Sequence, residues 1–199
     1  YDRYVADMSV RACRGKFARH CHRPVLNAWF TGKPSAVGRE RAMRQMRGTG
    51  SDRRREGLRF LGVGAAHALE LGASAAVLER AGRPELLIDC GPGVPQRFAD
   101  RYGEIPTAIF ITHVHLDHVA GLEQVFVGAA TNPALGPVRL YAPAPIVVDL
   151  HARVGTLPFS LAEGGSNFWD AFQLVPVRDG FWHGGDWFDV FPVRHHAPE

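Results

Sequence analysis

The sequence has few of the features of a secreted or membrane-bound chain. Its cysteines, Cys13, Cys21 and Cys90, are odd in number and irregularly spaced, which argues against a disulfide framework and favours a reducing, cytoplasmic setting. Its longest apolar runs, such as residues 108–111, are far too short to cross a membrane. No signal-peptide pattern follows Tyr1. We therefore predict a cytoplasmic protein without a membrane span, and the missing initial Met predicts a processed chain or a fragment.

The net charge of +3 conceals two unlike parts. Residues 1–56 carry 14 Lys and Arg against 5 Asp and Glu, whereas residues 57–199 carry 9 basic and 15 acidic side chains. We therefore divide the chain into a basic N-terminal extension, residues 1–56, and a domain, residues 57–199. The extension is either an arm that attracts nucleic acid or phosphate, or a disordered segment, the state in which basic runs are more often found.

From residue 57 onward, apolar periodicity alternates between the two kinds of secondary structure. Strands are predicted over residues 58–63, 73–79, 85–90, 107–111, 138–141, 172–177 and 187–193, and helices over 94–102, 117–126 and 145–154. Pro176 and Pro192 predict edge positions or strand ends, because proline cannot donate to a strand ladder. Strands interspersed with helices indicate an α/β layered domain. His183, between the last two strands, is expected to be an ordinary turn histidine.

Three histidines and an aspartate stand within six residues, directly after a predicted strand. His113 and His115 are two apart, so in an extended segment they point to the same side and can share one metal ion. Asp117 and His118 follow where the chain turns into a helix, and they suit a second ion close by. Imidazole and carboxylate ligands are typical of zinc, and also of iron or manganese. Two such ions can hold a bridging hydroxide, which is a strong nucleophile at neutral pH.

The stretch Thr-His-Val-His-Leu-Asp-His-Val-Ala-Gly-Leu, residues 112–122, resembles the signature of the metallo-β-lactamase superfamily. Residues 60–64 are similar to its first-strand motif, and residues 87–91 to its second motif, in which an aspartate, here Asp89, supports the metal site. Residues 188–196 resemble the strand that delivers a third metal histidine. The resemblance implies an αββα sandwich, of which residues 57–199 would supply largely the N-terminal half. The motifs resemble the ribonuclease Z and phosphodiesterase branch more than the antibiotic-degrading enzymes.

The resemblance also implies a site with two divalent metal ions, zinc first and iron or manganese as alternatives. The implied ligands are His113, His115, Asp117, His118 and His195. Asp117 would in addition orient the attacking water. The third histidine could instead be His196, but His195 is favoured because Pro198 then lies three residues beyond it, as in many relatives.

In the superfamily pattern, a bridging aspartate and a final histidine come after the third histidine. The sequence stops at Glu199 and holds no residue for those two places. Two explanations compete: the chain is a fragment, which we favour, or its open sheet edge is covered by a partner or by a second copy in a homodimer.

The function that these features favour is a metal-dependent hydrolase in which a metal-bound hydroxide attacks a phosphodiester, in a small molecule or a nucleic acid. A lactone or thioester hydrolase is an alternative within the enzymes. A non-catalytic module of the same fold, binding RNA or protein through its basic arm, is the alternative from another class.

Overall fold

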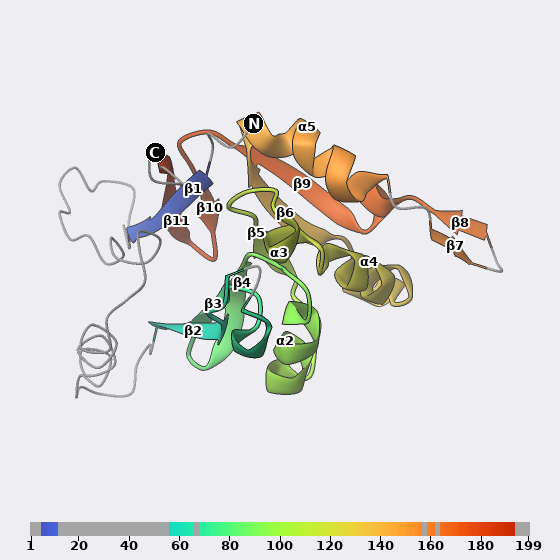
Figure 1. Ribbon diagram of the computed structural model, residues 1–199, viewed down its shortest axis with the longest axis horizontal. Coiled ribbons are helices and arrows are strands. Elements are labelled where there is room, and N and C mark those ends of the chain that lie inside the picture. The colour runs from blue at the N-terminus through green and yellow to red at the C-terminus, as the bar shows by residue number, and fades with distance from the viewer. Residues whose placement is uncertain (1–4, 12–55, 66–67, 157–158, 162–163, 194–199) are drawn as a thin grey trace.

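The structure is a computed structural model that describes residues 5–11, 56–65, 68–156, 159–161 and 164–193 (Figure 1). Its strands are β1 (Val5–Arg11), β2 (Glu56–Gly62), β3 (Ala75–Arg80), β4 (Arg83–Ile88), β5 (Ala108–Phe110), β6 (Val138–Pro143), β7 (Phe159–Leu161), β8 (Gly164–Ser166), β9 (Phe172–Val177), β10 (Gly180–His183) and β11 (Asp186–Val193). Its α-helices are α2 (Val94–Tyr102), α3 (Leu116–Val119), α4 (Leu122–Ala130) and α5 (Val147–Leu150). Short 3-10 turns are η1 (Leu69–Leu71), η2 (Pro133–Leu135), η3 (Ala144–Ile146) and η5 (Phe168–Asp170), and η4 (His151–Gly155) is a π-helical turn.

Six strands form the main sheet, in the order β2-β3-β4-β5-β6-β9. The pairs β2–β3 and β3–β4 are antiparallel, whereas β4, β5, β6 and β9 run parallel to one another. The parallel strands are joined by crossovers that contain α2, α3 with α4, and α5, as parallel pairing requires. A second, antiparallel sheet has the order β1-β11-β10, and the β7–β8 hairpin stands apart from both (Figure 1).

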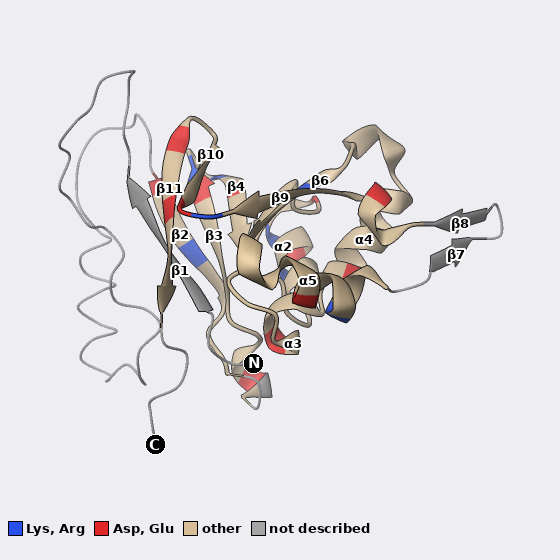
Figure 2. Cartoon of the chain, turned by 90° about the horizontal axis from the view of Figure 1, so that it is seen from above, with Lys and Arg blue, Asp and Glu red and all other residues tan. Residues whose placement is uncertain are grey.

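Alternation along the central strands divides the core into two layers. Ile109 of β5 faces a cluster shared with the helices, while its neighbours Ala108 and Phe110 face a second cluster shared with β10 and β11. Aromatic rings fill this second layer, in which Phe181 stacks on Phe110 and on Phe188 at centroid distances of 5.5 and 5.1 Å. Figure 2 shows the result, with the helices on one side of the main sheet and the small sheet on the other. The α/β layered fold predicted from the sequence is confirmed.

Helix α2 illustrates how local sequence sets an element. Gly93 and Gly103, with φ of 74° and 75°, stand immediately before and after it, and Pro95 occupies its first turn. The amide of Gly103 donates to the carbonyl of Ala99, which closes the last turn. The helix spans the predicted residues and buries Val94 and Phe98. At nine residues it is as long as α4, and no helix among the residues described has the length and apolar character of a membrane span.

Two of the predicted helices are each interrupted in the structure. The helix predicted over 117–126 is divided into α3 and α4, because the chain bends at Ala120 and Gly121 to meet the loop after β4. The helix predicted over 145–154 is divided into η3, α5 and the π-helical η4. Pro176 lies on the edge strand β9, and Pro192 is the penultimate residue of β11, so both prolines stand where the sequence places them.

Candidate metal centre

The candidate site begins where two adjacent parallel strands end. Strands β4 and β5 pair through Leu87 with Ile109 and Ile88 with Phe110, so both release the chain at the same edge of the sheet. Asp89 follows β4 directly, and residues 112–118 follow β5. Polar side chains that are far apart in the sequence therefore meet at this edge, which is where ligands bind in open α/β sheets.

Asp89 is the polar centre of this edge. It is 1% exposed and has a φ of 59°, a backbone conformation that few residues other than glycine adopt. Its carboxylate accepts hydrogen bonds from the backbone amide of Thr112 at 2.8 Å, from the Thr112 hydroxyl at 2.8 and 3.0 Å, and from Nδ1 of His118 at 2.8 Å. Because these hydrogen bonds engage both carboxylate oxygens, we infer that Asp89 orients the metal-binding side chains and does not itself contact the metal.

The predicted ligands of the 112–118 motif lie together. The ring centroids of His113 and His115 are 4.7 Å apart, and those of His113 and His118 are 4.0 Å apart. Oδ2 of Asp117 lies 3.5 Å from Nε2 of His118. The two pairs expected from the sequence, His113 with His115 and Asp117 with His118, are thus each close in space and adjoin one another. His195 and the alternative His196 lie outside the described residues.

Burial divides these side chains into two kinds. His113 and His118 are 5% and 7% exposed, while His115 and Asp117 are half-buried and open to solvent on one side. Burial alone lowers the pKa of His118, but the charge and hydrogen bond of Asp89 and the charge of Asp117 outweigh it and leave that pKa raised. The site is therefore a negatively polarised environment that favours a cation beside its imidazoles.

Two glycines let the backbones approach closely at this point. A Cβ on Gly91 would meet the carbonyl oxygen of Asp117, and one on Gly121 would meet the carbonyl oxygen of Gly91. Cys90, which precedes Gly91, donates its backbone amide to the His118 carbonyl, and its own carbonyl accepts from the Gly121 amide, both at 2.8 Å. The Asp89-Cys90-Gly91 segment thus fixes the backbone of the histidine loop, and the Cys90 thiol is fully buried with its pKa raised by burial and by Asp89.

The donor set fits a divalent transition metal. Polar side-chain atoms of His113, His118 and the supporting Asp89 lie within 4.8 Å of one another. Nδ1 of His118 faces Asp89 and Nδ1 of His113 lies 2.9 Å from the Thr112 hydroxyl, so Nε2 is the nitrogen that each ring turns away from these contacts. A histidine held through one nitrogen by a carboxylate or hydroxyl, with the other nitrogen for metal, is the usual arrangement at zinc sites. Asp117 adds a carboxylate oxygen beside His118.

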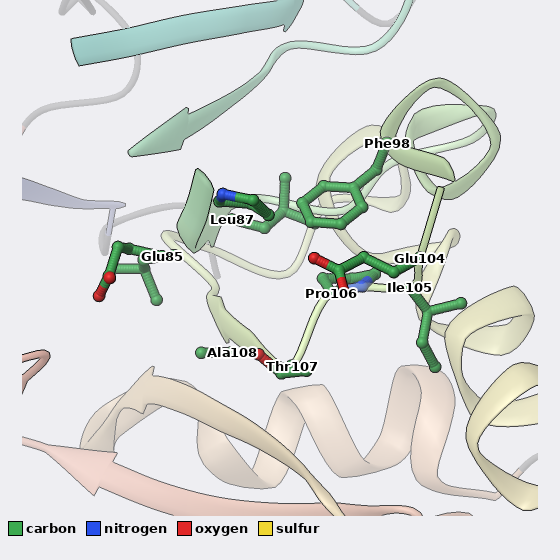
Figure 3. A pocket seen from close by; sticks show the side chains of 10 residues that line it. Glu85, Leu87, Phe98, Glu104, Ile105, Pro106, Thr107 and Ala108 are labelled. Carbon is green, nitrogen blue, oxygen red and sulfur yellow. The ribbon is translucent and has the colours of Figure 1, made fainter. Parts of the chain in front are cut away.

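Two cavities lie away from this site. One of about 10 Å³, the size of a single water, lies between α2, the start of β4 and the loop before β5, with Phe98 and Glu104 among its lining residues (Figure 3). A wider hollow of about 290 Å³ lies between α4, η2 and η5. Both are at the opposite ends of the parallel strands from Asp89, so neither belongs to the metal centre.

Comparison with known proteins agrees with this geometry. The family model described as Anti-Pycsar protein Apyc1 matches residues 57–198. The chain belongs to the Apyc1 family. An Apyc1 protein of Paenibacillus xerothermodurans is 30% identical over 130 residues, and the match covers 63% of this chain and 51% of that relative. This match and the similarity to ribonuclease Z proteins together confirm the resemblance to the metallo-β-lactamase superfamily predicted from residues 112–122.

Two further relatives complete the comparison. A ribonuclease Z of Gemmatimonas aurantiaca is 40% identical over 89 residues, covering 43% of this chain and 28% of that protein. Among solved structures, the metallo-β-lactamase fold protein YhfI of Bacillus subtilis matches 64% of this chain and 48% of its own, with a TM-score of 0.46 and 15% identity. The chain spans about half or less of the length of the curated Apyc1 and ribonuclease Z relatives that it matches.

Proposed function

We propose that this chain forms part of a metal-dependent hydrolase that cleaves phosphodiesters, and that His113, His115, Asp117, His118 and His195 are its metal ligands. The observation that carries the proposal is the buried Asp89, which joins the histidines of the 112–118 motif at the ends of β4 and β5. The similarity to proteins named ribonuclease Z supports a phosphodiester as the bond that is cleaved. The site would take two divalent ions, zinc first, with iron or manganese as alternatives.

The protein's own residues have distinct parts in this proposal. Divalent ions held here would supply Lewis acidity toward a phosphoryl group. The buried His113 and His118 give the site a fixed shape, while Asp117, whose side chain is 20% exposed, reaches solvent beside His118. A carboxylate in that position can orient a water molecule and accept its proton. Substrates would be small-molecule or nucleic-acid phosphodiesters; homodimer formation and a cytoplasmic location stay predictions.

Hydrolysis of bis(p-nitrophenyl) phosphate by the complete protein of which this chain forms part tests the proposal. We expect turnover with Zn²⁺ or Mn²⁺ that a chelator abolishes and added metal restores. His113→Ala and Asp117→Ala should each lower the rate by at least about 100-fold, since each removes a metal ligand or the water-orienting group. The matched control is His151→Ala, because His151 is exposed and its Nδ1 accepts a hydrogen bond from Nε1 of Trp169 at 2.9 Å.

Other outcomes separate the alternatives. Hydrolysis of lactones or thioesters without phosphodiester turnover would favour the other enzyme class. Salt-sensitive RNA binding without turnover, lost when residues 1–56 are deleted, would favour the binding module. Equal rates for wild type and His113→Ala would contradict the ligand assignment itself.

A further inference from the structure

We propose that Thr112 is a positioning residue that sets which nitrogen of His113 faces the metal, and that Asp89 thereby orients two histidines at once. His118 is oriented directly, and His113 through the Thr112 hydroxyl. The inference rests on the proposed metal site, but the proton positions it concerns belong to the metal-free protein.

The contacts of the Thr112 hydroxyl determine the direction of each hydrogen bond. Its oxygen lies 2.8 and 3.0 Å from the two oxygens of Asp89 and 2.9 Å from Nδ1 of His113. A hydroxyl has one proton and can accept further bonds, whereas a carboxylate can only accept. Donating to the charged acceptor is the stronger arrangement, and donating to His113 instead would leave hydroxyl lone pairs against the carboxylate. The proton therefore goes to Asp89, and the oxygen accepts from Nδ1–H of His113.

The same carboxylate sets the second ring. Nδ1 of His118 lies 2.8 Å from Oδ2 of Asp89, so this ring also carries its proton on Nδ1. In their neutral form both imidazoles then present an unprotonated Nε2, the form that binds a metal ion. The two ring centroids are only 4.0 Å apart, although the sequence assigns the two histidines to different ions. One buried carboxylate therefore sets the proton position on a ligand of each ion.

The residue type at position 112 follows from this arrangement. Thr112 is 4% exposed and is bound to Asp89 through both its amide and its hydroxyl, so the same carboxylate holds its backbone and its side chain. Serine would keep the hydroxyl in place. Valine has the same shape and keeps the amide bond, but it removes the only hydroxyl that connects Asp89 to His113 among the contacts described here.

The test is a long-range ¹H–¹⁵N spectrum of the metal-free full chain with ¹⁵N-labelled histidine, recorded at rising pH until the ring signals of His113 and His118 no longer change, so that both imidazoles are neutral. His113 and His118 signals are identified by their loss in His113→Gln and His118→Gln. We expect both rings as the Nδ1–H tautomer in wild type and in Thr112→Ser. In Thr112→Val, His113 should become a mixture of tautomers while His118 is unchanged. His183 is an internal control, because its Nε2 donates to the Glu85 carbonyl and it should show the opposite tautomer in every folded variant.

A second readout measures metal affinity directly. Chelator competition with Zn²⁺ should show binding weaker by about 10- to 100-fold in Thr112→Val, the usual cost of losing a group that orients a metal-binding histidine. Thr112→Ser should bind Zn²⁺ about as tightly as wild type. An Nε2–H tautomer of His113 in wild type, or no change of either readout in Thr112→Val, overturns the inference. Correct tautomers in a protein that hydrolyses no phosphodiester would instead overturn the proposed function alone.

Discussion

The phenol oxygen of Tyr141 lies 3.0 Å from Nδ1 of His183, and Nε2 of the same ring lies 2.9 Å from the carbonyl oxygen of Glu85. Because that carbonyl can only accept, Nε2 carries the proton and Nδ1 accepts from the Tyr141 hydroxyl. His183 of β10 is thereby bonded to β4 and β6 of the main sheet. The histidine expected to be an ordinary turn residue lies in a strand and connects the two sheets.

This connection predicts a pH-dependent stability. Burial lowers the pKa of His183, and its bond to the Glu85 carbonyl only partly opposes that shift. As pH falls below about 6.5, the ordinary histidine pKa, the unfolded chain binds the proton first. The free energy of unfolding should therefore fall with pH from about 6.5 down to the lowered folded pKa, and level off below it. Urea unfolding between pH 8 and pH 5 measures this loss.

The His183→Gln variant isolates the effect. Other groups titrate in the same range, but their contributions cancel in the difference between wild type and variant. We expect this difference to shrink as the pH falls, whereas His151→Gln, at an exposed position, should follow the wild-type curve. Parallel curves for wild type and His183→Gln would show that His183 does not titrate as argued.

A second prediction concerns the contact between β3 and α2. Glu79 accepts from Arg59 at 2.6 Å and from the Tyr102 hydroxyl at 2.8 Å. Burial would raise the pKa of Glu79, but these two bonds outweigh it and lower that pKa, while burial and the bond to Glu79 raise the pKa of Tyr102 to about 12. Tyr102→Phe should lower the free energy of unfolding by about 1 kcal/mol at pH 7, as measured in urea.

The free energy of unfolding above pH 10 tests the raised pKa of Tyr102. An unfolded tyrosine ionises near pH 10, before the folded Tyr102 does, so the stability from this group is present below about pH 10 and is lost as pH rises toward 12. Tyr102→Phe should have a shallower loss over that interval. Equal loss of stability by both proteins over that interval would contradict the raised pKa of Tyr102.

How far the sequence predicts this molecule depends on the range of the interactions involved. The bounds of α2 are predicted correctly because flanking glycines act locally, and β9 is likewise found at its predicted residues. The break between α3 and α4 is missed because it depends on Gly121 donating to Cys90, some thirty residues away. Strand β10 is missed because residues 180–183 lie beside a turn signal and pair only in the small sheet.

The candidate site shows the same division. His113, His115, Asp117 and His118 follow from spacing along one segment, and the structure brings them together. The resemblance assigns Asp89 a supporting part, but its link to His113 through Thr112 depends on how two parallel strands align, which periodicity does not encode. The signal available was the threonine that opens the motif directly after a buried strand.

The close approach of Gly91 to the histidine loop yields a prediction for the site. A Cβ at this position would meet the Asp117 carbonyl oxygen and lie 2.6 Å from Cβ of Ala73, so Gly91→Ala should displace the loop that carries the ligands. We expect loss of zinc binding, and destabilisation of about 1–3 kcal/mol, measured by calorimetry and by urea unfolding. Gly57→Ala is the matched control, since a Cβ there meets nothing within 4 Å. Wild-type zinc affinity in Gly91→Ala would show that the close approach of Gly91 to the histidine loop is not needed for metal binding.

Metal removal tests the ligands through folding rather than catalysis. A metal that binds the folded chain alone stabilises it by about 2.7 kcal/mol at a free concentration 100 times its dissociation constant. Zinc should therefore raise the melting temperature of the wild-type chain, and a chelator should reverse the rise. His118→Ala removes an imidazole held by Asp89 and should reduce the shift, whereas His151→Ala should keep it. A zinc-induced shift of equal size in His118→Ala would place the metal away from the Asp89 cluster, because a buried ligand cannot be lost from a site without a change in its affinity.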